Sequence, residues 1–207
     1  MAGIVDTFAN IVTPKPNALM PVANGSEEIE VAALTDILAR GGVRVIIADV
    51  DGDEDHVVTL AKGLELQADK TIFHCGDDNY DLIVVPGGPG AKTLGDCSFL
   101  VDMIRKQKAA GRWFGGICAG PVDVLFRHAL VTGPMTCFPG YKDQVGDLYR
   151  DQPVVVSDNC VTSQGPGTAV AMGLKLVEVL RSTKIASNLA NDLVYRLEQP
   201  PHHSTRA

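Results

Sequence analysis

The sequence predicts an α/β fold in which a doubly wound, mostly parallel sheet carries helices on both faces. Short β-rich runs alternate with helical runs along the chain, which is typical of parallel strands joined by right-handed crossovers. Residues 43–50, VRVIIADV, are almost entirely apolar, as expected for a strand covered on both faces. With 207 residues and 45% hydrophobic content, the chain is long enough to bury one full core.

The first half of the chain opens with a strand and a helix. Residues 18–23 form an apolar run that predicts the first strand, and residues 28–40 predict a helix that ends at the glycine pair 41–42. The apolar strand 43–50 runs into the acidic turn 51–55. Two shorter and less central strands are expected at 60–66 and 71–73.

The second half repeats the alternation around a glycine-rich loop. Residues 80–85, YDLIVV, predict a core strand that ends in the loop 86–90, PGGPG. Residues 99–108 predict a helix whose basic end suits the negative pole of the helix dipole. Residues 113–117 predict a strand that leads into a short helix at 122–125. The remaining expected elements are a hairpin of strands 154–156 and 160–162, and helices at 168–180 and 184–197.

Both chain ends are expected to lie outside the folded domain, which we place at residues 18–197. Residues 1–17 lack a basic start followed by an apolar core, so they predict an N-terminal extension rather than a signal peptide. Residues 198–207 predict a disordered tail, in which His202 and His203 are expected to be solvated rather than bound to metal.

Charge and cysteine content exclude several classes of protein. The formal net charge of −7 argues against general affinity for nucleic acid or anionic membranes. No apolar run approaches the length needed to span a bilayer. The five cysteines are scattered and form no CxxC pair, which argues against a disulfide framework or a zinc site. Reduced thiols in the cytoplasm are therefore expected.

A reactive cysteine is predicted at Cys118, within the sequence GICAGP at 116–121. The thiol lies at a strand-to-helix junction between glycines, and such a junction permits the tight, strained turn of a nucleophile elbow. The positive end of the following helix is expected to face the sulfur and to favour the thiolate.

The loop at 24–30, NGSEEIE, is expected to meet this thiol at the carboxyl ends of the strands. Acidic residues favour the first turn of a helix, and this suffices to explain Glu27 and Glu28. Glu30 lies further round the helix and is a candidate to point toward the thiol, where a protonated carboxyl would donate a hydrogen bond to a thiolate. A plain helix-start role for Glu30 stays open.

The glycine-rich loop 86–90 is better suited to an oxyanion hole than to phosphate binding. It lacks the Lys-Ser/Thr pair of a P-loop and the spacing of a dinucleotide fingerprint. The backbone N–H groups of Gly88 and Ala119 are natural donors beside a nucleophile.

The histidines do not provide a convincing general base for a cysteine protease. His56 and His74 fall near early loops, and His128 lies beyond the elbow at an expected helix end. Cys137 follows an expected strand and is a candidate secondary thiol at the site, whereas Cys160 is expected to be a buried strand residue.

Four ordered motifs resemble the ThiJ/PfpI superfamily, in the DJ-one/YajL branch of protein deglycases and glyoxalase III-like proteins. The similarity covers about residues 18–180. The motifs are GSEEIE at 25–30, VPGG at 85–88, ICAGP at 117–121 and TSQGPGT at 162–168. The resemblance implies a flavodoxin-like three-layer sandwich, a class I glutamine amidotransferase-like domain that usually forms homodimers.

The resemblance also implies roles for single residues. Cys118 matches the family's oxidation-sensitive nucleophile, Glu30 matches the acid that hydrogen-bonds it, and Gly88 and Ala119 match the backbone donors. Protease-like members carry His where this chain has Ala119, which argues against peptidase activity. Some relatives carry His at the position of Phe138, so here the mechanism is expected to depend on Cys118 and Glu30.

The implied activity is cysteine-dependent, cofactor-free detoxification of reactive dicarbonyls, without a metal ion. The substrate would be methylglyoxal, converted to lactate (glyoxalase III), or a glycated protein side chain (deglycase). The alternative is a non-enzymatic redox sensor or redox-regulated chaperone that works through oxidation of Cys118. The thiazole monophosphate (thiamine) biosynthesis label of some relatives finds no support in these residues.

Overall fold

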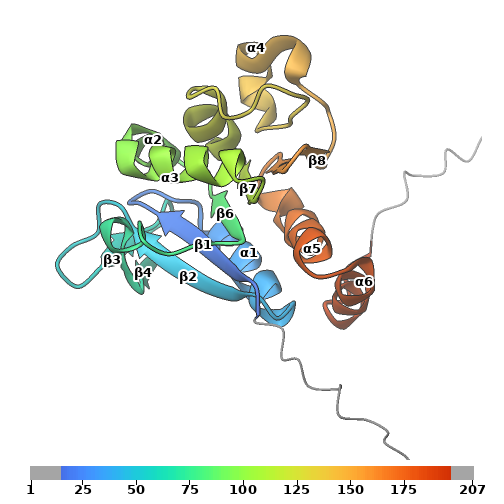
Figure 1. Cartoon of the computed structure of the whole chain (residues 1–207), viewed down its shortest axis with the longest axis horizontal. Coiled ribbons are helices and arrows are strands. Elements are labelled where there is room, and N and C mark those ends of the chain that lie inside the picture. Colours follow the sequence, from blue (N-terminus) through green and yellow to red (C-terminus); the bar gives the residue numbers. More distant parts are fainter. Residues whose placement is uncertain (1–14, 197–207) are drawn as a thin grey trace, which may run out of the picture.

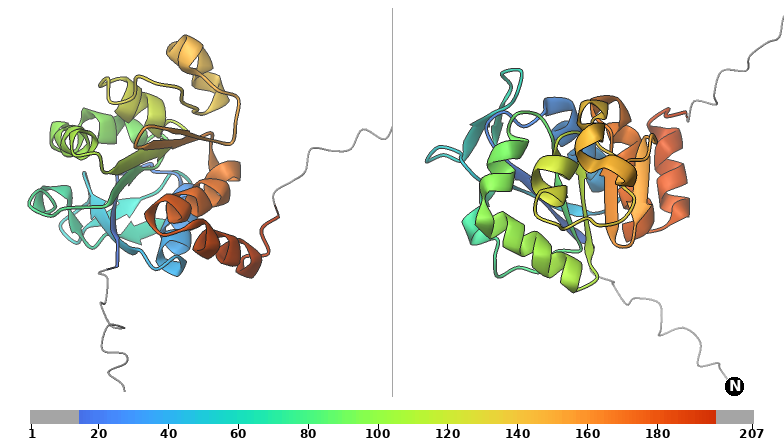
Figure 2. Two further views of the ribbon diagram at one scale, coloured as in Figure 1. Left: turned by 45° about the vertical axis from the view of Figure 1, so that its right-hand side comes forward. Right: turned by 90° about the horizontal axis from the view of Figure 1, so that it is seen from above.

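A computed structural model describes residues 15–196, which fold around one seven-stranded sheet with helices on both faces (Figure 1, Figure 2). The strand order is β5-β2-β1-β6-β7-β9-β8, and every neighbouring pair is parallel except β8 with β9. The predicted α/β class and mostly parallel sheet are therefore confirmed. The strands are β1 Asn17–Val22, β2 Arg44–Asp49, β5 Lys70–Thr71, β6 Leu82–Val85, β7 Trp113–Ile117, β8 Val154–Ser157 and β9 Cys160–Ser163.

The helices fall into two groups that pack against opposite faces of the sheet. The longer helices begin and end close to their predicted positions. The helices are α1 Glu28–Arg40, α2 Ala91–Asp96, α3 Ser98–Ala109, α4 Lys142–Val145, α5 Ala169–Leu180 and α6 Thr183–Asp192. A π-helical turn, Pro121–Phe126, follows β7, and a 3₁₀ turn, Pro139–Tyr141, precedes α4.

Side-chain alternation along the strands divides the apolar core into two layers. Leu19 and Ile83 pack on the face covered by α2 and α3, whereas Met20 and Leu82 pack on the face covered by α1 and α5. This division follows from the two-residue period of a strand, which sends successive side chains to opposite faces. Each such fully buried side chain contributes about 2 kcal/mol of hydrophobic free energy.

Several elements differ from those predicted from sequence, among them α4, which was not expected. The expected strand at 60–66 is mainly the turn of a separate antiparallel hairpin, β3 Val57–Thr59 with β4 Glu65–Gln67. The strand expected at 71–73 stops after Thr71 and continues as a 3₁₀ turn. Helix α2 directly follows the glycine-rich loop and was not expected, and α6 ends at Asp192 rather than at residue 197.

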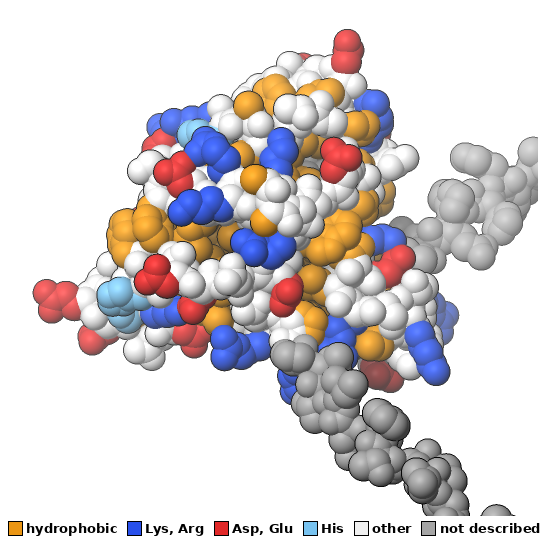
Figure 3. Space-filling view, in the orientation of Figure 1, with side chains coloured by type: hydrophobic (Ala, Val, Ile, Leu, Met, Phe, Trp, Pro, Cys, Tyr) orange, Lys and Arg blue, Asp and Glu red, His pale blue; other side chains and the backbone are white. Residues whose placement is uncertain are grey.

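The predicted chain ends fall largely outside the described residues. This holds for the N-terminal extension 1–17, of which only residues 15–17 are described, and for the tail 198–207 with His202 and His203. The division into an extension, one domain and a tail therefore stays a prediction. Within residues 15–196, no helix is long and apolar enough to cross a membrane. On the face drawn in Figure 3, acidic and basic side chains are interspersed rather than gathered by sign.

Candidate active site

Three loops meet at the carboxyl ends of β1, β6 and β7, which are neighbours in the sheet. The Gly90 N–H donates to the Gly25 carbonyl oxygen over 2.9 Å, and the Glu27 N–H donates to the Gly87 carbonyl oxygen over 3.2 Å. These bonds join the loop after β1 to the glycine-rich loop after β6. The third loop begins at Cys118, directly after β7.

Cys118 lies at a strained turn between β7 and the π-helical turn. Its φ angle is +62°, a left-handed conformation that costs a residue with a Cβ about 1 kcal/mol or more. The backbone is held in place on both sides. The Cys118 N–H donates to the Ser163 carbonyl oxygen over 3.0 Å, and the Cys118 carbonyl oxygen accepts from the Phe138 N–H over 2.9 Å. The half-buried thiol thus projects into a cleft from a fixed position.

Glu30 is fully buried in the first turn of α1 and points toward the thiol, not outward like a helix-start acid. Its Oε2 atom accepts a hydrogen bond of 2.7 Å from the Gly87 N–H. A Cβ at Gly87 would lie 2.5 Å from Cys118 Cβ and 3.0 Å from Glu30 Oε2, so the thiol and the carboxyl flank the same glycine. Glu30 Oε1 is buried and has no hydrogen-bond partner of normal geometry in the described part of the chain.

Burial dominates the acid–base properties of this pair. Burial raises the pKa of Glu30 to about 7, against the hydrogen bond from Gly87, which lowers it. Burial and the charge on Glu30 raise the pKa of Cys118 to about 12, although the N–H groups of Gly88 and Ala119 lower it. The N–H of Ala119, just before the helical turn, thus lowers the pKa of the thiol as expected, but burial outweighs it. The net effect of the surroundings on the thiol is to favour the protonated form.

Gly88 and Ala119 supply the two backbone donors that face the sulfur. Gly88 has a φ of +77°, and a Cβ at this position would lie 2.5 Å from the Gly25 carbonyl oxygen. Only glycine fits this close approach without displacing the loop after β1. The two N–H groups therefore form a preorganised pocket for negative charge on the sulfur or on an oxygen bound next to it.

The thiol opens into a cleft of about 460 Å³. Three lining residues, Lys92, Asp123 and Tyr141, were not found from sequence. They lie in α2, the π-helical turn and the 3₁₀ turn, which are too short to show a hydrophobic period. The full lining is Gly88, Pro89, Lys92, Cys118, Ala119, Asp123, Phe138 and Tyr141.

Cys137, the candidate second thiol at the site, does not line the cleft. Cys137 is fully buried in the core layer under α2 and α3, and burial raises its pKa to about 11. Its neighbour Phe138, by contrast, is 46% exposed and lines the cleft.

The three histidines within residues 15–196 lie away from the cleft lining. His56 pairs with the buried Asp49 at 2.8 Å, His128 bonds the Gly95 carbonyl oxygen at 2.8 Å, and His74 is exposed. The same residues contain no cluster of three or more His, Cys, Asp or Glu side chains able to hold a metal ion.

The chain matches known proteins over most of its length. The model of the DJ-1/PfpI family matches residues 16–179. "Glutathione-independent glyoxalase DJR-1.2" of Caenorhabditis elegans is 37% identical, over 81% of this chain and 90% of the relative. "Glutathione-independent glyoxalase DJ-1" of Schizosaccharomyces pombe is 35% identical, over 78% of this chain and 89% of the relative. The solved structure "Toxoplasma gondii DJ-1, oxidized" superposes with a TM-score of 0.84 at 37% identity, covering 88% of this chain and 100% of that one.

Proposed function

Since the chain belongs to the DJ-1/PfpI family, we propose that it detoxifies reactive dicarbonyls with Cys118 and Glu30, converting methylglyoxal to lactate. Two relatives that align over most of the chain are named glutathione-independent glyoxalases. The observation that carries the proposal is a half-buried thiol beside a fully buried carboxyl whose pKa lies at about 7. A group with this pKa both accepts and releases protons at neutral pH.

The first step forms a carbon–sulfur bond. The aldehyde carbon of the substrate lies over the Cys118 sulfur, and the Glu30 carboxylate takes the thiol proton as the sulfur attacks. The aldehyde oxygen becomes negative and accepts hydrogen bonds from the N–H groups of Gly88 and Ala119. One such donor typically contributes about 3 kcal/mol to stabilising the transition state. Protonation of that oxygen by Glu30 completes a hemithioacetal.

The second step moves a proton between two carbons. The Glu30 carboxylate removes the proton from the carbon bonded to sulfur, which gives an enediolate, and returns it to the neighbouring carbon, while the hydroxyl proton on the first carbon passes to the oxygen of the second. The product is the lactate thioester of Cys118. Water then cleaves the carbon–sulfur bond, releases lactate and restores the thiol. The net reaction adds one water molecule, and the oxidation of one carbon balances the reduction of the other.

Early glycation adducts of protein side chains are proposed as a second kind of substrate for the same thiol. The cleft is open to solvent along the side chains of Lys92 and Phe138, so it can receive a group carried on another chain. The test measures how fast a methylglyoxal adduct is lost from the side chain of a cysteine or arginine whose main-chain amino and carboxyl groups are blocked. Loss no faster than the spontaneous release of methylglyoxal would reject this second substrate.

Lactate formation from methylglyoxal tests the main proposal. The wild type is expected to form lactate, whereas Cys118→Ala and Glu30→Gln are expected to lose this activity. Cys97→Ala is the matched control, because Cys97 is a half-buried thiol between α2 and α3 that does not line the cleft. No lactate above background from the wild type would reject the enzyme proposal.

We also propose that two copies pair through the outer face of α1 and the β3–β4 hairpin. This face has an apolar groove of about 390 Å³, and Leu64, which lines it, is 56% exposed. Glu28 Oε2 and Thr35 Oγ1 are buried there without a hydrogen-bond partner among the described residues. Uncovered apolar side chains and unsatisfied polar atoms together favour an interface.

Light scattering tests the homodimer. The wild type is expected at twice the mass of the chain, and Leu64→Glu is expected to be monomeric. Val194→Glu is the control, because Val194 is 77% exposed and does not line the groove. A monomeric wild type would reject the interface.

All five cysteines are free, so we further propose a cytoplasmic location, where thiols stay reduced.

A second candidate function is oxidation sensing through Cys118, as a redox sensor or redox-regulated chaperone. The observation in its favour is the half-buried thiol beside two N–H donors, which would hold the oxygens of a sulfinate. Peroxide would supply the oxygens and be reduced to water. Mass spectrometry after mild peroxide treatment is expected to find two added oxygens on Cys118 first. First oxidation at another cysteine would reject the sensor.

A further inference from the structure

Asp123 is the one carboxyl among the described residues that lines the Cys118 cleft, and the steps proposed above do not use it. Those steps end in a thioester of Cys118, and its hydrolysis is faster when a base takes a proton from the attacking water. We propose that Asp123 is this general base and accepts a proton from the water molecule that cleaves the thioester. The inference rests on the proposed dicarbonyl chemistry and adds a catalytic residue to it.

Glu30 lies on the wrong side of the sulfur for this step. It is fully buried and does not line the cleft, and the Gly87 N–H holds its Oε2 atom over 2.7 Å. The water that hydrolyses the thioester enters from solvent through the open cleft. The base therefore has to lie on the open side of the acyl group, which is where the half-buried Asp123 lies.

The Asp123 carboxylate is free to bind water. No hydrogen bond from another residue of the described part of the chain acts on it, and only burial and nearby charges change its pKa. Burial raises the pKa of Asp123, Arg127 and Lys92 lower it, and Asp96 raises it. Arg127 itself is paired with Asp96 at 2.7 Å. Both carboxylate oxygens are thus available to accept a proton, and a raised pKa makes the group a stronger base.

The backbone fixes Asp123 one turn after an oxyanion donor. The Asp123 N–H donates to the Ala119 carbonyl oxygen over 2.9 Å, and the Ala119 N–H faces the sulfur. On its other side, the Asp123 carbonyl oxygen lies so close to α2 that a Cβ at Gly95 would clash with it. Both residues belong to the loop and π-helical turn that follow β7, and π-helical turns are frequent at functional sites. The proposed base and the donor therefore keep a fixed spacing.

Tyr141 indicates that Asp123 and Cys118 face the same space. Burial raises the pKa of the Tyr141 hydroxyl, and the charges of Asp123 and Cys118 raise it further, so this hydroxyl lies near both groups. The charge on Glu30 raises the pKa of Cys118, whereas Asp123 is not among the groups that affect it. Asp123 therefore lies farther from the sulfur than Glu30 does. This separation leaves room for the acyl group and for the water that attacks it.

The hydrolysis balances with water as the only co-reactant. The water oxygen bonds to the thioester carbon as Asp123 takes one water proton, and the carbonyl oxygen becomes negative beside the N–H groups of Gly88 and Ala119. When the carbonyl forms again, the carbon–sulfur bond breaks and the sulfur leaves with its electron pair. The proton held by Asp123 returns to the sulfur and restores the thiol, and lactic acid releases its own proton to solvent.

The test separates formation of the thioester from its hydrolysis. Asp123→Asn keeps the shape of the side chain and removes the base. This variant is expected to form lactate about 100-fold more slowly in the steady state and to accumulate the Cys118 thioester. Mass spectrometry of the intact protein counts the adduct. Hydroxylamine then identifies it, because hydroxylamine converts a thioester to a hydroxamate and does not do so with a hemithioacetal.

Asp143→Asn is the matched control. Asp143 is an exposed acidic residue close to Tyr141 in sequence and does not line the cleft, so this variant is expected to keep the wild-type rate. Hydroxylamine added during turnover is expected to speed the consumption of methylglyoxal by Asp123→Asn more than that by the wild type, because this strong nucleophile attacks a thioester without a base. Such a rescue also shows that the variant is folded.

Equal rates of lactate formation in Asp123→Asn and Asp143→Asn would overturn the inference. A slow Asp123→Asn that accumulates no thioester would also overturn it, because Asp123 would then act before the hydrolysis. In both cases, lactate formed by the wild type leaves the proposed function standing. If the wild type forms no lactate, the proposed function fails, and the role of Asp123 fails with it.

Discussion

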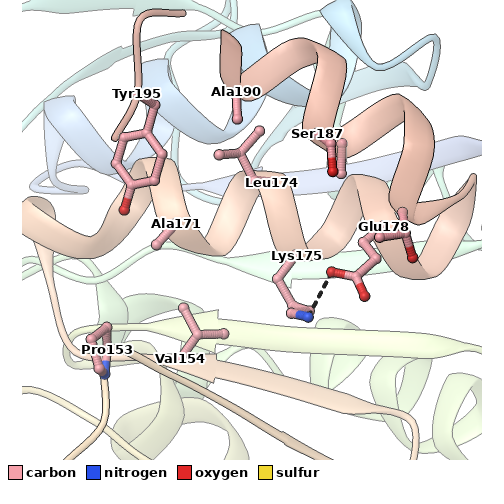
Figure 4. A pocket seen from close by; sticks show the side chains of 11 residues that line it. Pro153, Val154, Ala171, Leu174, Lys175, Glu178, Ser187, Ala190 and Tyr195 are labelled. Atoms are coloured by element: carbon pink, nitrogen blue, oxygen red, sulfur yellow. Dashed lines mark hydrogen bonds and ion pairs between the residues drawn. The ribbon is translucent and has the colours of Figure 1, made fainter. Parts of the chain in front are cut away.

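Two hollows of nearly equal size differ in almost every other respect. The Cys118 cleft has a volume of about 460 Å³, and a second hollow of about 450 Å³ lies between α5, α6 and β8 (Figure 4). We call the second hollow the C-terminal pocket. It is lined by Pro153, Val154, Ala171, Leu174, Lys175, Glu178, Thr183, Ala186, Ser187, Ala190 and Tyr195.

The C-terminal pocket consists of ordinary packing. Figure 4 shows Leu174 and Ala190 facing each other across it, and its one ion pair joins Lys175 to Glu178 at 2.6 Å. The Cys118 cleft contains a residue with a φ of +62° and adjoins a fully buried carboxyl. Each of these features costs folding free energy. Features that cost folding free energy therefore mark the candidate site, whereas the volume of a hollow does not.

The largest expected effect is that of Cys118→Ala on activity. Loss of the nucleophile is expected to reduce lactate formation at least about 1,000-fold. The free energy of unfolding is expected to change by less than about 1 kcal/mol, because the substitution removes a single sulfur atom from a half-buried side chain. Turnover assays and urea unfolding of the same preparation measure both quantities. If Cys118→Ala lost activity only because less of the protein is folded, Cys118 would be a structural residue. The contrast between the Cys118 cleft and the C-terminal pocket would then disappear.

The buried carboxyl is expected to make stability depend on pH. The unfolded chain releases the Glu30 proton near pH 4.5, whereas the folded chain keeps it until about pH 7. Stability from this group is therefore full below pH 4.5 and falls as pH rises to 7, by about 3 kcal/mol in all at about 1.4 kcal/mol per pH unit. Glu30→Gln lacks this titration. The difference in unfolding free energy between the two proteins should change between pH 4 and 8, and a constant difference would contradict the shifted pKa.

Gly88→Ala is expected to lower both activity and stability. The new Cβ would meet the Gly25 carbonyl oxygen at 2.5 Å, in a backbone conformation that favours glycine. A loss of about 2 kcal/mol of unfolding free energy is expected, together with weaker turnover because one N–H donor moves. Gly63→Ala is the control, since Gly63 also has a positive φ but has open space around its Cβ position. Similar losses of turnover in both variants would show that strain alone, not the donor, explains the effect.

The smallest effect is expected in the C-terminal pocket. Leu174→Ala removes a half-buried side chain and is expected to cost about 1 to 2 kcal/mol of unfolding free energy. Turnover of methylglyoxal per folded molecule is expected to stay unchanged. A large drop in kcat without unfolding would mean that this pocket takes part in the reaction.

Local patterns predicted the fold and the centre of the site. The elbow at Cys118 and the glycine at position 88 follow strands, and strand ends of a parallel sheet meet by topology. Tyr141 and Asp123 could not be predicted in this way, because they lie in 3₁₀ and π-helical turns without a hydrophobic period. The hairpin turn that begins at Leu60 resembles a strand in sequence, because its apolar residues are separated by polar ones as in a strand.

The protonation state of the site could not be predicted from sequence either. A helix start beside a thiol favours the thiolate, and this local rule set the expectation for Cys118. In the folded protein, burial outweighs the backbone donors and raises the pKa of Cys118 to about 12. Burial depends on how α1 and the loops pack together, which no single segment of sequence encodes.

The proposed function requires that Glu30 and Cys118 act as one acid–base pair. Its most direct test is a titration of the Glu30 carboxyl carbon by NMR, assigned with Glu30→Gln. The titration midpoint is expected near pH 7 in the wild type, as given by the pKa of about 7. It should rise in Cys118→Ala, because the lost thiol no longer lowers the pKa of Glu30. A midpoint near 4.5 in both proteins would contradict the claim.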